Sequence, residues 1–197
     1  MARSDRRGEL QDAAVRVAYQ SGLSGLTLAH VAEAAGMPLG GLYYYYKTRD
    51  DMVASIVERM EDQMAVCVVG FEAAGGPQAA LRAFVGFVLG NREGLMRFGC
   101  PIGTLSAQLR KEPGSLGLRM GAVLGGMSAW AGQQFEALGL EPGQAGAQGR
   151  MLLVKLEGAA MMAHATGEAG FIDEVVAEVL AQIDRLAASQ AQQGVQG

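Results

Sequence analysis

Cysteine, aromatic residues and charge are all scarce in this chain of 197 residues. Its two cysteines, Cys67 and Cys100, cannot form a zinc site alone, and we expect them to be reduced thiols. No apolar run approaches the roughly 18 residues of a membrane-spanning helix, so we expect no membrane partner. The charged N-terminus lacks the apolar stretch of a secretory signal, which favours a cytoplasmic protein.

Catalytic motifs are missing as well. The two histidines, His30 and His164, stand in no metal-ligand spacing. The sequence contains neither Gly-x-Ser-x-Gly nor a phosphate-binding glycine loop followed by Lys and Ser or Thr. We therefore predict that the protein is not an enzyme and has no catalytic residue, no cofactor and no metal.

The net charge of −4 is unevenly distributed. Residues 1–50 hold six basic and five acidic side chains, whereas the rest of the chain has a net charge of −5. The N-terminal quarter is thus the part of the chain that a polyanion would not repel.

Apolar residues recur at helical spacing along almost the whole chain, and no segment alternates as a strand would. Thr27 is expected to cap one helix, and Thr-Arg-Asp-Asp at 48–51 resembles a capping box at the start of a long one. The pattern predicts an all-α fold of about nine helices. They cover residues 9–19, 28–35, a short stretch from 38, 48–74, 78–90, 102–111, 115–139, 146–166 and 171–188.

Residues 36–47 read GMPLGGLYYYYK and contain four of the five tyrosines. Two short helices with a tight turn between Thr27 and Tyr44 suit a helix-turn-helix, whose second helix lies in the DNA major groove. Successive residues of a helix point about 100° apart, so the four tyrosines cannot share one role. Some can reach phosphates and Tyr46 can lie on the core side; the alternative is that the whole run only packs against the core.

The stretch TLAHVAEAAGMPLGGLYYYYKTRDDM resembles the signature of the TetR (tetracycline repressor) family of bacterial transcription regulators, over about residues 5–55. The resemblance implies an all-α homodimer that binds a palindromic operator in double-stranded DNA. It also implies a helix-turn-helix domain at 1–47 and a ligand-binding and dimerisation domain at 48–197. Phosphate contacts are implied for Thr27, Tyr43, Tyr45 and Arg49, and a core position for Tyr46.

Two positions depart from the family pattern, because Pro38 and Gly41 stand where Ser or Thr is common. Base reading is then expected to fall to Leu39, Tyr44 and the backbone at Gly40, with Leu39 able to touch a thymine methyl group. The complete predicted set of DNA-binding residues is Thr27, Pro38, Leu39, Gly40, Gly41, Tyr43, Tyr44, Tyr45, Lys47, Thr48 and Arg49.

A second resemblance concerns residues 98–112, FGCPIGTLSAQLRKE, which are similar to a motif of the subgroup that includes the LmrA and YxaF repressors. The motif is either a structural turn or a part of the pocket wall that contains Cys100. Methionine, aromatic residues and many helical glycines favour a pocket for an apolar or aromatic effector. The predicted ligand-binding residues are Phe84, Phe87, Met96, Cys100, Gln108, Met120, Met127, Trp130 and His164, although a lone histidine is more often structural.

The last two helices carry apolar stripes at three- and four-residue steps, which predict a four-helix dimer interface. The predicted interface residues are Leu152, Leu156, Ala159, Ala163, Val175, Val179 and Ile183, and one of the two stripes could instead be ordinary core. The sequence therefore predicts a ligand-responsive, DNA-binding regulator, with a repressor released from its operator by the effector as the expected form. The alternative is a helical small-molecule-binding or interaction protein that does not bind DNA.

Overall fold

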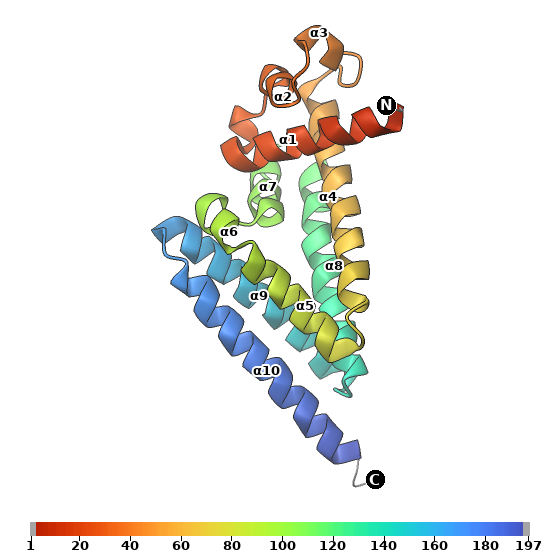
Figure 1. Cartoon of the computed structure of the whole chain (residues 1–197), viewed down its shortest axis with the longest axis vertical. Coiled ribbons are helices and arrows are strands. Elements are labelled where there is room, and N and C mark those ends of the chain that lie inside the picture. Colours follow the sequence, from red (N-terminus) through yellow and green to blue (C-terminus); the bar gives the residue numbers. More distant parts are fainter. Residues whose placement is uncertain (1–2, 195–197) are drawn as a thin grey trace. The chain divides into compact units, whose positions relative to one another are not determined.

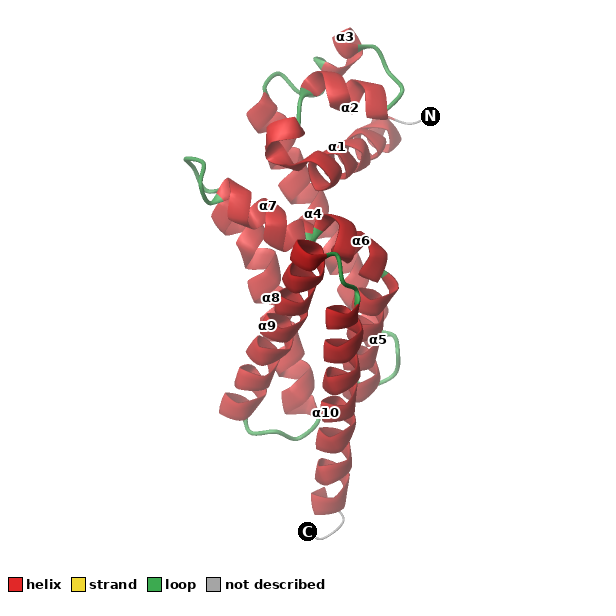
Figure 2. Ribbon diagram, turned by 90° about the vertical axis from the view of Figure 1, so that its left-hand side faces the viewer, coloured by secondary structure: helices red, strands yellow, loops and turns green. Residues whose placement is uncertain are grey.

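The structure is a computed structural model that describes residues 3–194, with side chains described for residues 6–189 (Figure 1). The described residues form ten helices and no strand. Figure 2 shows these helices joined by loops. The helices are α1 (Arg3–Gly25), α2 (Leu28–Ala34), α3 (Leu39–Leu42), α4 (Arg49–Glu72), α5 (Pro77–Gly90), α6 (Arg92–Phe98), α7 (Pro101–Leu109), α8 (Leu116–Ala137), α9 (Pro142–Thr166) and α10 (Gly170–Gly194).

The predicted all-α fold is confirmed, and one helix was missed. Helix α6 has seven residues, of which only Leu95 is buried, so it lacks the repeated apolar stripe that reveals longer helices. It ends at Gly99, whose φ of 78° is a conformation that glycine adopts readily. No helix in the described part of the chain is long and apolar enough to cross a membrane.

The helices divide into two compact units. We call residues up to 64 together with residues 101–123 the head unit, and residues 65–100 together with those from 124 onward the body unit. By sequence, the head unit holds ten basic and ten acidic side chains, so the whole net charge of −4 belongs to the body unit. The boundary at residue 47 that the family resemblance implied stays a prediction.

Helix α1 is the support of the head unit. Its residues Leu10, Ala13 and Ala14 are completely buried. On another face, Asp12 accepts from Nε and Nη2 of Arg59 in α4 at 2.7 and 2.9 Å. Because a bidentate pair between a guanidinium and a carboxylate fixes orientation as well as distance, α1 and α4 are held in one register.

In the body unit, α10 packs against both α5 and α9, and α6 packs against α9. Ion pairs also join α10 to its neighbours: Asp184 to Arg82 of α5, and Asp173 to Arg92 of α6. Exposed pairs of this kind contribute little stability, so the packing depends on the buried apolar faces. Those faces include Leu81, Val176 and Ile183.

Candidate nucleic-acid interface

Helix α2 begins as its sequence predicts. The Thr27 side chain accepts a hydrogen bond from the His30 amide at 3.1 Å, and Thr27 itself is extended. Val31 and Ala32 are buried, while Thr27 and His30 are exposed. The helix therefore turns its first residues to solvent and its later apolar residues to the core.

Helix α3 is a single turn that projects side chains outward. Pro38 precedes it in an extended conformation, and Leu42 is its buried anchor. Leu39 is 40% exposed, Tyr43 46% and Tyr44 61%. Large apolar and aromatic side chains that face solvent this fully indicate an interaction surface.

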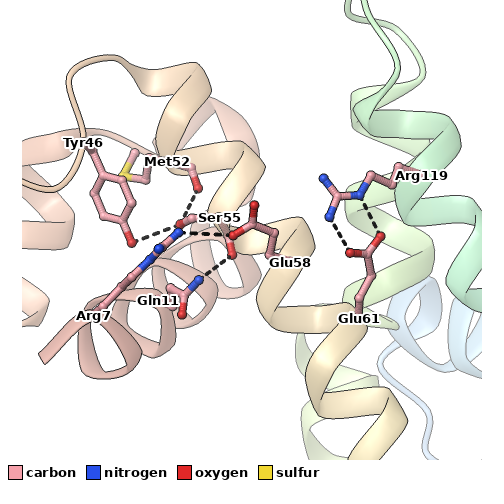
Figure 3. Close-up of polar contacts among 8 residues, drawn as sticks. All are labelled: Arg7, Gln11, Tyr46, Met52, Ser55, Glu58, Glu61 and Arg119. Atoms are coloured by element: carbon pink, nitrogen blue, oxygen red, sulfur yellow. Dashed lines mark hydrogen bonds and ion pairs between the residues drawn. The ribbon is translucent and has the colours of Figure 1, made fainter. Parts of the chain in front are cut away.

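The fourth tyrosine of the run has a different place. Tyr46 is 3% exposed, and its hydroxyl accepts a hydrogen bond from Ser55 of α4 at 3.0 Å (Figure 3). Burial raises the pKa of the Tyr46 phenol, and the Ser55 hydrogen bond lowers it by less. Tyr46 therefore occupies the predicted core position, and its hydroxyl has a partner there.

A reciprocal capping box holds the start of α4. The Asp51 amide donates to Thr48 Oγ1 at 3.1 Å, and the Thr48 amide donates to Asp51 Oδ2 at 3.0 Å. Lys47 Nζ donates to the Tyr43 carbonyl at 2.8 Å, so the lysine lies across the end of the tyrosine run. The predicted capping box is confirmed, and it fixes the loop that carries Lys47 and Thr48.

An open groove of about 670 Å³ lies beside the tyrosines in the head unit. It is lined by Arg7, Tyr44, Tyr45, Tyr46, Asp51, Ala54, Ser55 and Glu58. Tyr44 and Tyr45 meet edge to face there, with ring centroids 5.3 Å apart. Arg7 pairs with Glu58 at 3.4 Å, as Figure 3 shows. With two carboxylates and one guanidinium, the groove is a poor site for a phosphate.

Eight of the eleven predicted DNA-binding residues are exposed on the head unit. They are Thr27, Pro38, Leu39, Gly40, Tyr43, Tyr44, Lys47 and Thr48. Gly41, Tyr45 and Arg49 are half-buried. The sequence did not indicate that Arg49 would be held by other parts of the protein, as it is by Glu112 at 3.1 Å.

The predicted ligand-binding residues fall into several groups. Gln108 and Met120 belong to the head unit, where Gln108 accepts from the Leu23 amide at 2.8 Å. In the body unit, Phe84 and Phe87 both contact Phe71, with centroids 5.6 and 5.7 Å away. Trp130 contacts Phe71 and Phe84, and its Nε1 donates to Glu72 at 3.1 Å. Met127 is buried.

Two polar contacts link α9 to α6 and to Cys100, the second residue after α6, in the body unit. Nδ1 of His164 lies 3.1 Å from the Met96 carbonyl oxygen, and the Cys100 thiol forms a hydrogen bond with Glu157. Burial raises the pKa of Glu157 above the ordinary value of 4.5, and the Cys100 hydrogen bond lowers it by less. Sequence reasoning missed Glu157, because a single carboxylate in a long helix is usually exposed.

Glu157→Gln is expected to change how stability depends on pH. A carboxyl whose pKa is raised in the folded state holds its proton longer than the unfolded chain does, so stability falls as pH rises above 4.5 through the folded pKa. The Glu157→Gln variant has no carboxyl to ionise at this position, so its stability does not fall with pH for this reason. Thermal unfolding from pH 4 to pH 8 should show the variant close to the parent at pH 4 and more stable at pH 7; a gap independent of pH would contradict the assignment.

The predicted dimer residues lie in the core of the body unit. Leu152, Leu156, Ala159, Ala163, Val179 and Ile183 are all buried within the protomer, and Val175 is half-buried. A different set is exposed on α9: Met151, Val154, Met161 and Met162, with Val154 63% and Met161 64% exposed. Ala147 and Ala165 continue this spacing and are also exposed. We call Ala147, Met151, Val154, Met161, Met162 and Ala165 the α9 stripe.

Comparison with known proteins supports a DNA-binding role for the helix-turn-helix of the head unit. The family described as "Bacterial regulatory proteins, tetR family" matches residues 10–56. The regulator AcrR of Shigella flexneri is 30% identical over 87 residues, which are 43% of this chain and 40% of AcrR. The regulator BetI of Burkholderia thailandensis is 33% identical over 85 residues, 42% of this chain and 44% of BetI. The chain thus spans less than half the length of these curated relatives.

Solved structures resemble nearly the whole chain. A TetR-family regulator from Agrobacterium tumefaciens has a TM-score of 0.78 at 18% identity, covering 91% of this chain and 97% of its own. A TetR regulator from Legionella pneumophila has a TM-score of 0.76 at 14% identity, covering 94% and 97%. These proteins are regulators, and the matches to them agree with the prediction that the chain is not an enzyme. Residues 10–56 of the chain match the TetR family of bacterial regulatory proteins, and the described helices have the fold of solved structures of regulators from that family.

Proposed function

We propose that the protein is a transcriptional regulator that binds double-stranded DNA through α2, α3 and the start of α4. One observation carries this proposal: within residues 27–48, eight of the ten predicted DNA-contact positions are exposed, while Val31, Leu42 and Tyr46 of the same segment are buried. A surface made of hydroxyls, phenols, glycine backbone and one lysine suits phosphate contact and base reading.

The regulator would act as a homodimer through the α9 stripe. With Gly158 between Val154 and Met161, the stripe follows three- and four-residue steps, and none of its members is charged, so it can pack against its own copy across a two-fold axis. Helix α9 is thus apolar on two faces, one for the protomer core and one for a partner. Two heads would then read the two halves of a palindromic operator.

An apolar or aromatic effector is the proposed ligand of the body unit. Phe71, Phe84 and Trp130 form a buried aromatic cluster, and Phe87, which touches it, is 42% exposed. Polar groups near Cys100, such as Glu157, could orient the guest. Helix α4 carries residues of both units, so an effector that favours one tilt of α4 would shift the population of DNA-binding heads and release the operator.

We propose in addition that the protein belongs to the subgroup that includes LmrA and YxaF, and residues 98–112 are the basis of this proposal. A second candidate function is a small-molecule-binding or interaction protein that does not bind DNA. It gains some support from the head unit's balance of ten basic and ten acidic side chains, since that unit has no net attraction to DNA. Binding to DNA separates the two functions.

Substitutions at two exposed residues should affect binding differently. The test uses a fluorescent duplex that the parent protein selects from a random library, and fluorescence anisotropy as the readout. Tyr43→Phe removes a phosphate donor and should weaken binding about three- to tenfold on selected and unrelated duplexes alike. Leu39→Ala should reduce discrimination at one base pair by about fivefold while unrelated duplexes bind as before. If both variants match the parent on every duplex, these contacts are wrongly assigned.

A further inference from the structure

The backbone N–H and C=O of one residue in the head unit are bound by side chains from two other helices. Helix α1 departs from helical geometry at Gly22, whose φ is 68° and ψ 177°. The next residue, Leu23, is buried, so its backbone N–H and C=O both need partners. Gln108 of α7 accepts from the N–H at 2.8 Å, and Nη2 of Arg49 donates to the C=O at 3.2 Å.

Arg49 also reaches the turn that follows α7. Its Nη2 lies 3.1 Å from Oε1 of Glu112, and its Nη1 lies 3.3 Å from Oε2. Arg49 is the first residue of α4. Its guanidinium therefore joins the end of α1, the start of α4 and the turn between α7 and α8. We call Leu23, Arg49, Gln108 and Glu112 the Arg49 node.

The chain segment 101–123 has a second attachment to α4. Nε and Nη2 of Arg119 in α8 donate to the two carboxylate oxygens of Glu61 at 2.9 and 2.5 Å (Figure 3). Ile102, Leu105 and Leu109 of α7 are buried, and α7 packs on α1. Residues 101–123 are therefore attached to α1 through α7, and to α4 through Arg119.

We infer that Arg49, Gln108 and Glu112 are positioning residues for DNA binding: they orient α1 and the first turn of α4, and Arg49 does not grip a phosphate. This inference rests on the proposed DNA-binding function. The family resemblance implied the opposite role for Arg49. The geometry favours positioning, because the guanidinium already has a forked carboxylate and a backbone carbonyl as acceptors.

Glu112→Gln separates the two roles of Arg49 by the direction of its effect. If Arg49 gripped a phosphate, losing the competing carboxylate would strengthen DNA binding and steepen its salt dependence. If Arg49 positions α4, losing its anchor weakens binding and leaves the salt slope unchanged. Removing an acidic charge by itself favours DNA binding, so a weakening would run against the general electrostatic trend.

Thermal stability is not expected to follow the DNA affinity. Arg49 and Glu112 are 38% and 40% exposed, and ion pairs at such sites contribute little to folding. Glu112→Gln should therefore unfold within about 2 °C of the parent. A loss of affinity at unchanged stability distinguishes positioning from a general structural role.

The experiment measures anisotropy of the parent-selected duplex over a series of salt concentrations. The variants are Glu112→Gln, Arg49→Ala and the exchange of Arg49→Glu with Glu112→Arg, and Asp62→Asn serves as a control at another acidic residue of the head unit. We expect Glu112→Gln and Arg49→Ala to bind about three- to tenfold more weakly with the parent's salt slope. The exchange should recover at least half of the loss, and the control should bind as well as the parent or slightly better.

Three results would overturn the inference. Tighter binding of Glu112→Gln with a steeper salt slope would make Arg49 a phosphate contact. Binding within twofold of the parent for both single variants would show that the node does not position the head. A parent that selects no duplex at all would overturn the proposed function, and this inference with it.

Discussion

Gly149→Ala is expected to lower the free energy of unfolding by roughly 3 kcal/mol or more, the upper part of the range for overpacking. A Cβ at Gly149 would collide with the Ser128 carbonyl oxygen and lie 2.5 Å from the Gly132 amide nitrogen. These are backbone atoms of α8, which cannot swing aside as a side chain can. The added methyl group must therefore push α8 and α9 apart.

Gly125→Ala is the matched control on α8, because a Cβ there has open space around it. Alanine in the interior of a helix stabilises by about 0.5–1 kcal/mol relative to glycine, so this variant should unfold slightly above the parent. Differential scanning calorimetry compares the three proteins, and we expect Gly149→Ala to melt about 6–12 °C below the parent. Equal melting temperatures for the two variants would show that α8 and α9 do not approach closely at Gly149.

Val154→Glu is expected to weaken the proposed dimer by about a hundredfold or more. Burying a valine contributes about 1.5 kcal/mol or more, and in a two-fold interface each substitution occurs twice, which gives about 3 kcal/mol or a factor of about 100. The two glutamates would also repel each other across the axis. Sedimentation velocity over a range of protein concentrations measures the shift from dimer to monomer.

Val66→Glu is the control, because Val66 is also a highly exposed valine but lies on α4 rather than in the α9 stripe. We expect this variant to remain as dimeric as the parent. The monomeric Val154→Glu protein should also bind the selected duplex far more weakly, since it presents a single head. Dissociation by Val66→Glu, with Val154→Glu still dimeric, would place the interface elsewhere.

Local features of the sequence predicted much of the head. The Thr27 cap, the Thr48–Asp51 capping box and the buried Tyr46 all depend on residues within nine positions of one another. Such contacts follow from helical geometry and residue chemistry, and a single sequence shows both. The exposed positions of α2 and α3 follow from the same periodicity.

Long-range contacts could not be predicted in this way. Arg49 and Glu112 are 63 positions apart, and nothing in either segment signals their pairing. Helix α9 shows a different difficulty, because both of its faces are apolar: Leu152 and Leu156 on one, Met151 and Val154 on the other. Periodicity identifies two stripes in such a helix but does not say which one faces the protomer's own core.

The central claim is that two copies of the exposed helix-turn-helix bind one DNA duplex, and a stoichiometric titration with a salt series tests it most directly. The parent-selected duplex, at a concentration well above its dissociation constant, should saturate at two protomers per duplex. The logarithm of the binding constant should then fall with the logarithm of salt concentration with a slope of about −5 or steeper, as expected for several phosphate contacts. Saturation at one protomer per duplex, or binding that does not weaken with salt, would contradict the claim.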